Sequence, residues 1–334
     1  MAATLPATPL VRLWLSDEAA RPVYLKLETL QPTGSFKVRG ALAATAAYAG
    51  APGGIVTASA GNHGLGIAWA ASRLGVQATI VVPETASPAK IEALRAFPST
   101  LITHGTGYDA AEQYALDLAG DAGRYVSAYN DPYVIAGQSS MLAEILAQFP
   151  EPFTVVAPVG GGGLVSGLAL AAYACARDIK VVGVESAASP AVSAAVRHGH
   201  VVPVSVAATI ADGLAGNLDQ AAITPGIIRF TKTQLEVAEE HALRRAMRML
   251  AASAGIYAEG SAAAGLAAVL DGAVPADRPV VIAVTGRNIS FRAFADAIID
   301  DFPAGGSMSS PLASGSMSSP LARQEGPVGG SMSS

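Results

Sequence analysis

Short apolar runs rich in valine and isoleucine recur along the chain between Pro22 and about Asp300, with longer mixed segments between them. Runs that are apolar at every position are typical of parallel strands, which are buried on both faces. The sequence predicts strands at residues 23–27, 55–59, 78–82, 101–103, 125–128, 154–157, 181–184 and 280–284.

The segments between the predicted strands have helical periodicity. Apolar side chains recur at the spacing i, i+3, i+4 and i+7 in residues 142–149 and again in residues 243–250. This spacing gathers them in one buried stripe of a helix. Regular alternation of buried strands with helices predicts an α/β protein with right-handed crossovers.

Composition narrows the class of protein. The 334 residues are enough for about two domains. Because 51% of the residues are hydrophobic and only 14% are charged, a large core can form. The net charge of -5 argues against nucleic acid or an acidic membrane surface as a partner.

Targeting signals are also missing from the pattern. No stretch of about 20 residues is apolar throughout, so we expect no membrane-spanning helix. Residues 1–10 contain no basic stretch ahead of an apolar run, so we expect no signal peptide. Cys175 is the single cysteine and cannot form an internal disulfide. These features predict a cytoplasmic protein.

Residues 304–334 differ from the rest of the chain in composition. The octapeptide at 306–313 recurs at 315–322, and residues 331–334 repeat part of it. Glycine, serine and proline dominate, and such a segment has no apolar face to bury. We therefore predict a disordered low-complexity tail and assign it no function.

The first segment with candidate chemistry is 32–41, where a Thr-Gly-Ser turn leads to Phe36, Lys37 and the start of a predicted helix. A lysine that forms a Schiff base has to lose its proton, which favours a partly dry site. Phe36 could lie against a flat ring. Taken alone, a lysine in a first helical turn is more often a surface residue.

The second segment, 57–64, joins a predicted strand to an amphipathic helix through small residues and contains Ser59, Ala60, Asn62 and His63. A helix that begins after such a loop presents free N–H groups to an anion. Asn62 offers both a donor and an acceptor. The alternative is a simple helix entry capped by serine and asparagine, with His63 as a structural histidine.

The third segment contains four consecutive glycines, Gly160, Gly161, Gly162 and Gly163, followed by Leu164. Such a run has a large conformational entropy when unfolded, which indicates that the backbone comes very close to something. A phosphate at the following helix N-terminus is the main candidate. The spacing matches neither the dinucleotide fingerprint nor the Walker loop, and a flexible connector is the alternative.

Together these segments resemble the fold-type II pyridoxal-phosphate enzymes, most closely the branch of threonine and serine dehydratases and serine racemase. The resemblance runs from about Pro6 to Asp300 and includes residues 131–138, 209–214, 258–262 and 284–288. It implies the tryptophan synthase β-like fold, with two doubly wound three-layer α/β/α domains. Residues 1–53 and 131–303 would form the larger cofactor domain, and residues 54–130 a smaller mobile domain that closes over the substrate.

The resemblance also implies roles for single residues. Lys37 would form the Schiff base with pyridoxal phosphate and then act as the base at the substrate Cα. The other implied cofactor contacts are Phe36 on the ring, Asn62 on the phenolic oxygen, the main-chain N–H groups of Gly160, Gly161, Gly162, Gly163 and Leu164 on the phosphate, and Thr285 on the pyridine nitrogen. The implied substrate contacts are Ser59, Ala60, Asn62 and His63 near the carboxylate and Tyr129 near the side chain, although core packing explains Tyr129 equally well.

The implied activity is dehydration and deamination of a β-hydroxy amino acid such as L-threonine or L-serine to a 2-oxo acid and ammonia. A neutral hydroxyl at Thr285 makes the ring a weaker electron sink, which favours β-elimination. Ala60 replaces the serine that racemases of this type carry. Alternatives are a bulkier substrate such as phenylserine or hydroxyaspartate, a β-replacement synthase, or a binding module without catalysis.

The resemblance leaves the metal content and the assembly open. Glu185 stands where related enzymes bind a cation, but Ala191 lies about where an aspartate ligand would stand. A hard divalent cation prefers several oxygen ligands, so such a site is weakened, and a monovalent or divalent cation stays open. A homodimer or homotetramer is the implied assembly, with a small amino acid as the substrate.

Overall fold

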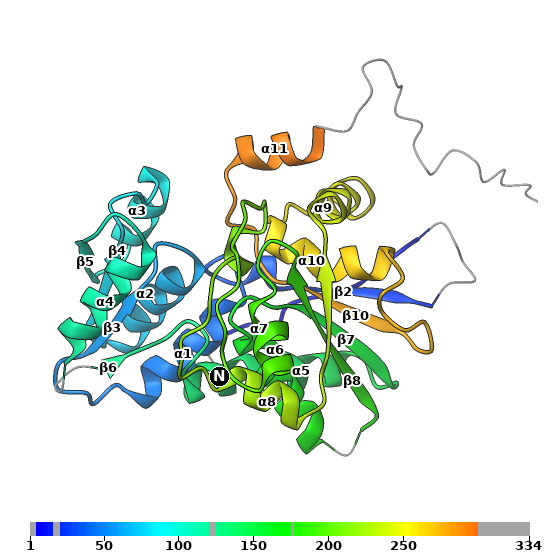
Figure 1. The fold of residues 1–334 in the computed structure, drawn as a ribbon, viewed down its shortest axis with the longest axis horizontal. Coiled ribbons are helices and arrows are strands. Elements are labelled where there is room, and N and C mark those ends of the chain that lie inside the picture. The colour runs from blue at the N-terminus through cyan, green and yellow to red at the C-terminus, as the bar shows by residue number, and fades with distance from the viewer. Residues whose placement is uncertain (1–4, 16–20, 121–123, 176, 300–334) are drawn as a thin grey trace, which may run out of the picture. The chain divides into compact units, whose positions relative to one another are not determined.

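The computed structural model describes residues 5–15, 21–120, 124–175 and 177–299. Two parallel or mainly parallel sheets organise this part of the chain (Figure 1). The strands are β1 (Leu10–Leu13), β2 (Val23–Leu27), β3 (Ile55–Ala58), β4 (Ala78–Val82), β5 (Thr100–Thr103), β6 (Arg124–Tyr125), β7 (Phe153–Pro158), β8 (Ile179–Ser186), β9 (Gln234–Ala238) and β10 (Val280–Val284).

Helices connect most of these strands. They are α1 (Lys37–Ala47), α2 (Asn62–Leu74), α3 (Pro88–Arg95), α4 (Tyr108–Ala119), α5 (Pro132–Gln148), α6 (Gly163–Ala174), α7 (Ala191–His198), α8 (Thr224–Phe230), α9 (Glu240–Ala254), α10 (Gly260–Leu270) and α11 (Phe291–Ile299), with 3-10 turns η1 (Glu28–Leu30) and η2 (Asp212–Leu214). None of the described helices is long and apolar enough to cross a bilayer.

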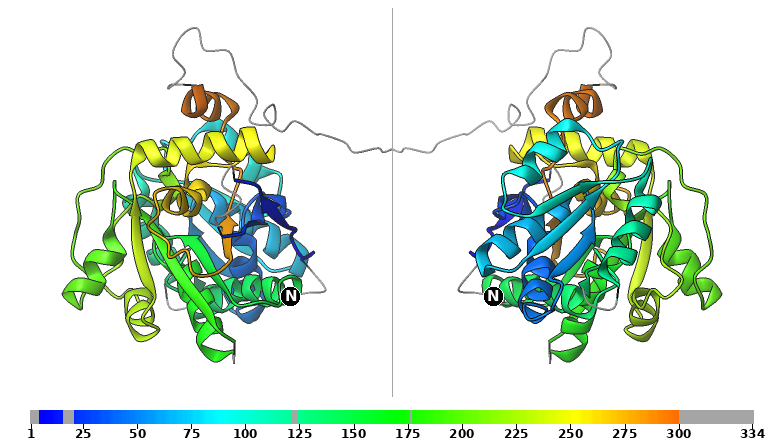
Figure 2. Two further views of the ribbon diagram at one scale, coloured as in Figure 1. Left: turned by 90° about the vertical axis from the view of Figure 1, so that its right-hand side faces the viewer. Right: turned by 90° about the vertical axis from the view of Figure 1, so that its left-hand side faces the viewer.

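The larger sheet has the strand order β1-β2-β10-β7-β8-β9 in the described part of the chain. Only β1 runs antiparallel, against β2, and the other neighbours are parallel. Successive side chains of a strand point to opposite faces, so both faces are apolar. Val155 and Val281 pack with α5 and α6, whereas Val156 and Ile282 pack with α9 and α10. Figure 2 shows α9 in yellow, with α11 in orange beyond it.

The smaller sheet has the order β5-β4-β3-β6, and every pair in it is parallel. It follows the same rule of alternation. Ile80 and Val82 pack against α2 and α3, and Val81 packs on the other face against α4. Each sheet is therefore the middle of three layers, and the predicted α/β class with two three-layer units is confirmed.

Most of the predicted strands are confirmed, with small shifts at their ends. The prediction at 125–128 was wrong beyond Tyr125, because the chain leaves the sheet there and its carbonyl groups bind side chains of other segments. Strands β1 and β9 were not predicted. Both lie at sheet edges and carry polar residues, so neither is a fully apolar run.

The four strands of the smaller sheet all fall within residues 54–130. The division into a larger domain and a smaller mobile domain stays a prediction. The predicted tail at 304–334 lies outside the described residues.

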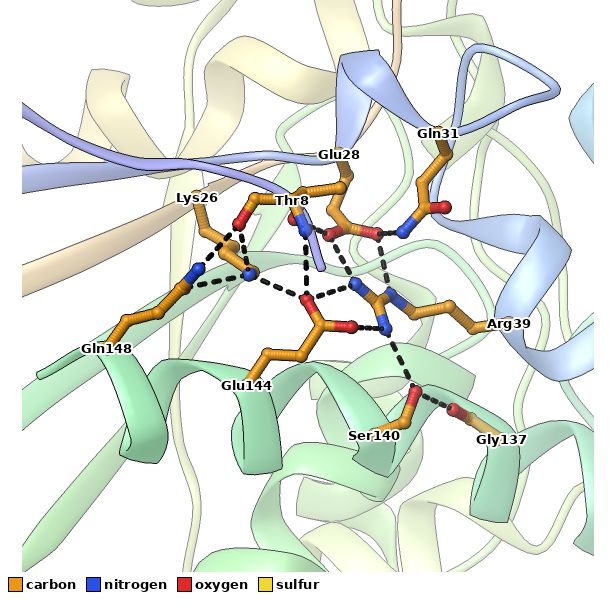
Figure 3. Close-up of polar contacts among 9 residues, drawn as sticks. All are labelled: Thr8, Lys26, Glu28, Gln31, Arg39, Gly137, Ser140, Glu144 and Gln148. Carbon is orange, nitrogen blue, oxygen red and sulfur yellow. Dashed lines mark hydrogen bonds and ion pairs between the residues drawn. The ribbon is translucent and has the colours of Figure 1, made fainter. Parts of the chain in front are cut away.

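A buried ionic cluster joins the segments that surround α1 (Figure 3). Arg39, whose side chain is 1% exposed, donates to both oxygens of Glu28 and to both oxygens of Glu144. Lys26 donates to Glu144 at 2.7 Å, and Thr8 donates its hydroxyl to Glu28 at 2.6 Å. Two cations therefore face two carboxylates, and the cluster is neutral. Burial alone raises the pKa of Glu144, but the bonds from Arg39 and Lys26 outweigh this and lower it.

Replacement of Arg39 by methionine should destabilise the fold strongly. The change leaves Glu28 buried without its cation, and breaking a buried ion pair from one side costs about 3–5 kcal/mol. Urea unfolding measures the loss. The control is Arg292→Met, because the Arg292 side chain is 93% exposed and its pair with Asp296 should contribute little. A loss in the Arg39 variant no larger than that of the control would contradict the prediction.

Candidate active site

The predicted site segments meet beyond the carboxyl ends of strands from both sheets. Ser59 follows β3, the glycine run begins shortly after β7, and Thr285 directly follows β10. Ligands of open parallel sheets bind at this end of the strands. The structure therefore brings together three segments that are far apart in the sequence.

The segment that carries Lys37 is held in place by the segment after β10. Phe36 donates its main-chain N–H to the Thr285 carbonyl at 2.9 Å, and Arg287 donates its own to the Gly34 carbonyl at 2.9 Å. Gly34 has φ of +73°, a conformation that glycine adopts at little cost. The turn thus delivers Lys37 to the first position of α1 against a fixed backbone.

The surroundings of the Lys37 amine disfavour its protonated form. It donates to the Ala128 carbonyl at 3.0 Å and lies 5.3 Å from the centroid of the Phe36 ring. Loss of hydration lowers the pKa of Lys37 to about 8, although the nearby Glu259 carboxylate acts in the opposite direction. An amine with this pKa reaches its neutral, nucleophilic form close to neutral pH.

Asn62, the first residue of α2, lies in a hydrogen-bonded group at the same place. Its amide nitrogen donates to the two Glu259 oxygens at 2.9 and 3.2 Å, and its amide oxygen accepts from the Asn288 side chain. Glu259 itself is 8% exposed. Burial raises the pKa of Glu259 to about 7, and the bond from Asn62 acts to lower it.

Sequence reasoning assigned no role to Glu259 or Asn288. Both lie in segments that carry the family resemblance, at 258–262 and 284–288. Neither follows a glycine-rich turn of the kind that indicates a ligand site. A carboxylate directly before an Ala-rich buried helix was the available signal. Charged residues are seldom fully buried without a partner, so Glu259 could have been singled out on that ground.

His63, Ser59 and Ala60 share the loop and helix start with Asn62. His63 is buried, and its Nε2 lies 3.1 Å from the Val126 carbonyl oxygen. Because a carbonyl only accepts, Nε2 carries the proton, and Nδ1 is a buried acceptor without a partner in the described part of the chain. Burial and the nearby Lys37 lower the pKa of His63 to about 3, so it is neutral. The Ser59 hydroxyl accepts from the Gly61 N–H at 3.2 Å, and Ala60 is half-buried.

The glycine run forms the turn that enters α6. Gly162 has φ of +86°, which favours glycine. Within the described residues, the main-chain N–H groups of 160–164 have no protein acceptor. Such N–H groups at a helix start suit a phosphate. The amine of Lys37, these donors and the Asn62 amide fit pyridoxal phosphate.

Two of the glycines also make room for Tyr129. A Cβ on Gly161 would overlap the Tyr129 ring, and one on Gly163 would lie 2.9 Å from the Tyr129 Cα. The Tyr129 hydroxyl accepts from the Asp219 N–H at 2.7 Å, and Thr224 donates to the Gly161 carbonyl at 2.7 Å. Tyr129 is thus packed on the glycine turn, and its contact with a substrate stays a prediction.

Glu185 has partners of its own. It is fully buried at the end of β8, and its carboxylate accepts from the Val192 N–H at 2.7 Å and from the N–H and hydroxyl of Ser193. These bonds tie it to the first turn of α7. Among the described residues, no group of three histidine, cysteine or acidic side chains is arranged to hold a metal ion. A cation at Glu185 stays a prediction.

A parallel three-layer fold defines a class of cofactor enzymes when it carries a half-buried lysine of lowered pKa and a glycine turn that follows the carboxyl end of a strand. Residues 3–286 match the family of pyridoxal-phosphate dependent enzymes. The chain is 37% identical to the L-threonine ammonia-lyase of Thermotoga maritima over 278 residues, which cover 82% of this chain and 69% of that protein.

Two solved structures are also similar. The processed form of threonine deaminase isoform 2 from Solanum lycopersicum has a TM-score of 0.81 and 29% identity, covering 88% of this chain and 87% of that one. Maize serine racemase has a TM-score of 0.81 and 28% identity, covering 90% and 93%. The chain belongs to the family of pyridoxal-phosphate dependent enzymes, and the resemblance inferred from the sequence is confirmed.

Replacement of Gly161 by alanine should destabilise the fold, because the new methyl group overlaps the Tyr129 ring. Overpacking of this kind costs about 1–3 kcal/mol. In chains that already carry Tyr129→Ala the same replacement should cost much less, as urea unfolding of the single and double variants would show. Gly226→Ala is the matched control, since no atom would lie within 4 Å of its Cβ. Equal losses with and without Tyr129 would refute the packing argument.

Proposed function

We propose that this protein catalyses β-elimination from a β-hydroxy amino acid, with L-threonine or L-serine as the substrate and a 2-oxo acid and ammonia as products. The observation that carries the proposal is the half-buried Lys37 amine, whose lowered pKa is influenced by the same Glu259 carboxylate that accepts from the Asn62 amide. The names of the relatives support it, since they include an L-threonine ammonia-lyase and a threonine deaminase.

Pyridoxal phosphate, when bound, supplies an aldehyde that condenses with amines and a ring that accepts electrons from the substrate Cα. The residues 160–164 would hold its phosphate through their N–H groups, and Phe36 would pack on its ring. Lys37 would provide the amine and, once displaced by the substrate, would take the proton from Cα. An amine with a lowered pKa suits both tasks because it is readily neutral.

Two residues near the site favour elimination over other reactions. Thr285, buried at the end of β10, would face the pyridine nitrogen with a neutral hydroxyl rather than a carboxylate. A neutral partner stabilises ring charge less, so early loss of the β-hydroxyl is favoured over long-lived carbanions. Ala60 has no hydroxyl, so it could not return a proton to the opposite face of Cα. Racemisation is therefore the weaker candidate.

The surface also supports the proposal of a homodimer or homotetramer. Several large apolar side chains are exposed on α5, α6 and α8, among them Tyr133 at 48%, Tyr173 at 67% and Phe230 at 60%. Tyr173 and Phe230 pack against each other with ring centroids 5.1 Å apart. Exposed apolar groups that cluster are typical of subunit contacts. Light scattering of the purified full chain would give the number of subunits.

A substrate panel tests the function. L-threonine, L-serine, phenylserine and hydroxyaspartate should be assayed for 2-oxo acid and ammonia, with and without potassium and magnesium. Lys37→Ala should lose the absorbance of the bound cofactor and at least about 1000-fold of the turnover, because both the nucleophile and the base are removed. Lys180→Ala is the control, because Lys180 lies at the amino end of β8, away from the site at the carboxyl ends of the strands, and its loss should leave turnover unchanged. Turnover or a cofactor band retained by the Lys37 variant would disprove the assignment.

The pH dependence of cofactor uptake tests the lowered pKa of Lys37. An amine attacks an aldehyde only when neutral, so the uptake rate should rise with pH and level off above about 8, where Lys37 has lost its proton. Stopped-flow mixing of the cofactor-free protein with pyridoxal phosphate measures the rate. The control is the side-chain amine of Nα-acetyl-lysine methyl ester. Its rate of reaction with pyridoxal phosphate should keep rising with pH up to the ordinary lysine pKa of 10.5. A protein profile that follows the free amine would contradict the prediction.

A further inference from the structure

Glu259 stands at a helix start but does not cap its own helix. It is the residue before α10, where a side-chain oxygen usually accepts from the following N–H groups, and it makes no such bond. Its carboxylate instead accepts from the Asn62 side chain and, at 3.2 Å, from the Asn288 N–H. The main-chain N–H of Glu259 donates to the Gly286 carbonyl. A Cβ on Gly286 would lie 2.5 Å from the Glu259 Oε1, so the carboxylate packs closely on this glycine.

The bonds around Glu259 have only one consistent direction. The Asn288 amide nitrogen donates to the Thr33 carbonyl at 2.9 Å and to the Asn62 amide oxygen. The Asn62 amide nitrogen donates to Glu259. Above pH 7, the value to which burial raises the pKa of Glu259, the two ends of this chain of bonds are a carbonyl oxygen and an ionised carboxylate, which only accept. The Asn62 nitrogen therefore has to point to Glu259, and the Asn288 nitrogen to Thr33.

We propose that Glu259 is a positioning residue that fixes the Asn62 amide with its nitrogen toward the cofactor site, so that Asn62 meets the phenolic oxygen of pyridoxal phosphate as a donor. This inference rests on the proposed cofactor contact of Asn62. The Asn62 nitrogen carries two hydrogens, and one is enough for the carboxylate, so the other is left for the cofactor. An N–H on this oxygen stabilises its deprotonated form.

A reversed amide would be costly in this group. Rotation of Asn62 by half a turn places its carbonyl oxygen against the Glu259 carboxylate and its nitrogen against the Asn288 nitrogen. Both contacts are repulsive, and a buried carboxylate left without a donor is strongly unfavourable. Without Glu259, the amide has no acceptor on that side, and the two orientations become closer in energy.

A double-mutant cycle in the full chain tests the proposal. Glu259→Ala, Asn62→Ala and the double variant should be freed of cofactor and titrated with pyridoxal phosphate, with absorbance reporting the dissociation constant. We expect each single change to weaken binding about tenfold, the effect of losing about one charge-assisted hydrogen bond. In the Asn62→Ala background, removal of Glu259 should change the constant less than twofold, because its effect passes through Asn62.

The result that would overturn the proposal is a Glu259 effect of equal size in both backgrounds, which indicates a general structural role, or no effect at all. If Glu259→Ala does not fold, Glu259→Gln keeps the size of the side chain and takes its place in the cycle, with a loss of about threefold expected. Glu239→Ala is the matched control, since Glu239 also precedes a helix without capping it and should leave binding unchanged.

The two proposals fail in different ways. If the unaltered protein takes up no pyridoxal phosphate, the proposed function is wrong. If it binds the cofactor through Lys37 and the cycle is additive, only the role of Glu259 is wrong. Thermal unfolding of all four chains separates lost binding from lost folding, since a positioning effect weakens cofactor binding in a chain that keeps its unfolding temperature.

Discussion

Arg39 is permanently charged and almost completely buried, and the region around α1 is arranged to satisfy it. Its five N–H groups find the carboxylates of Glu28 and Glu144 and the hydroxyl of Ser140. The partners come from η1 and α5, so the charge can be accommodated only when these segments are in place around α1. Lys37 begins the same helix two residues earlier. The ion pairs of Arg39 therefore hold the start of α1, and with it the Lys37 amine, in place.

Those elements whose sequence alone carries a strong pattern were predicted well. The central strands β4, β7, β8 and β10 contain short apolar runs rich in valine and isoleucine that are largely buried on both faces, so the runs mark them. The edge strands β1 and β9 were missed because one side of each lacks a neighbour and polar residues are tolerated there. Residues 126–128 serve another purpose, since the carbonyl groups of Val126 and Ala128 accept hydrogen bonds from His63 and Lys37.

Site residues that lie in a local turn before a helix could be predicted from the sequence. Contacts between segments that are far apart in the sequence could not. Lys37, Asn62 and the glycine run each lie at a junction before a helix, and such junctions can be found in the sequence. The bond from Asn62 to Glu259 spans 197 residues and that from Asn288 to Asn62 spans 226. No periodicity carries information over that range. The packing of Tyr129 on Gly161 is likewise a property of the folded chain, although the glycine was visible beforehand.

Glu259 links the two halves of the site electrostatically as well as through hydrogen bonds. Burial lowers the pKa of Lys37 and raises that of Glu259, so it disfavours the charged form of each group. The attraction of the Glu259 carboxylate opposes the shift of Lys37, and the pKa of the amine stays near 8 instead of falling further. Without this carboxylate the pKa of Lys37 would be lower, and the amine would be a weaker base toward a substrate proton. The same side chain that orients Asn62 thus also keeps Lys37 basic enough to accept a proton and free enough to release it.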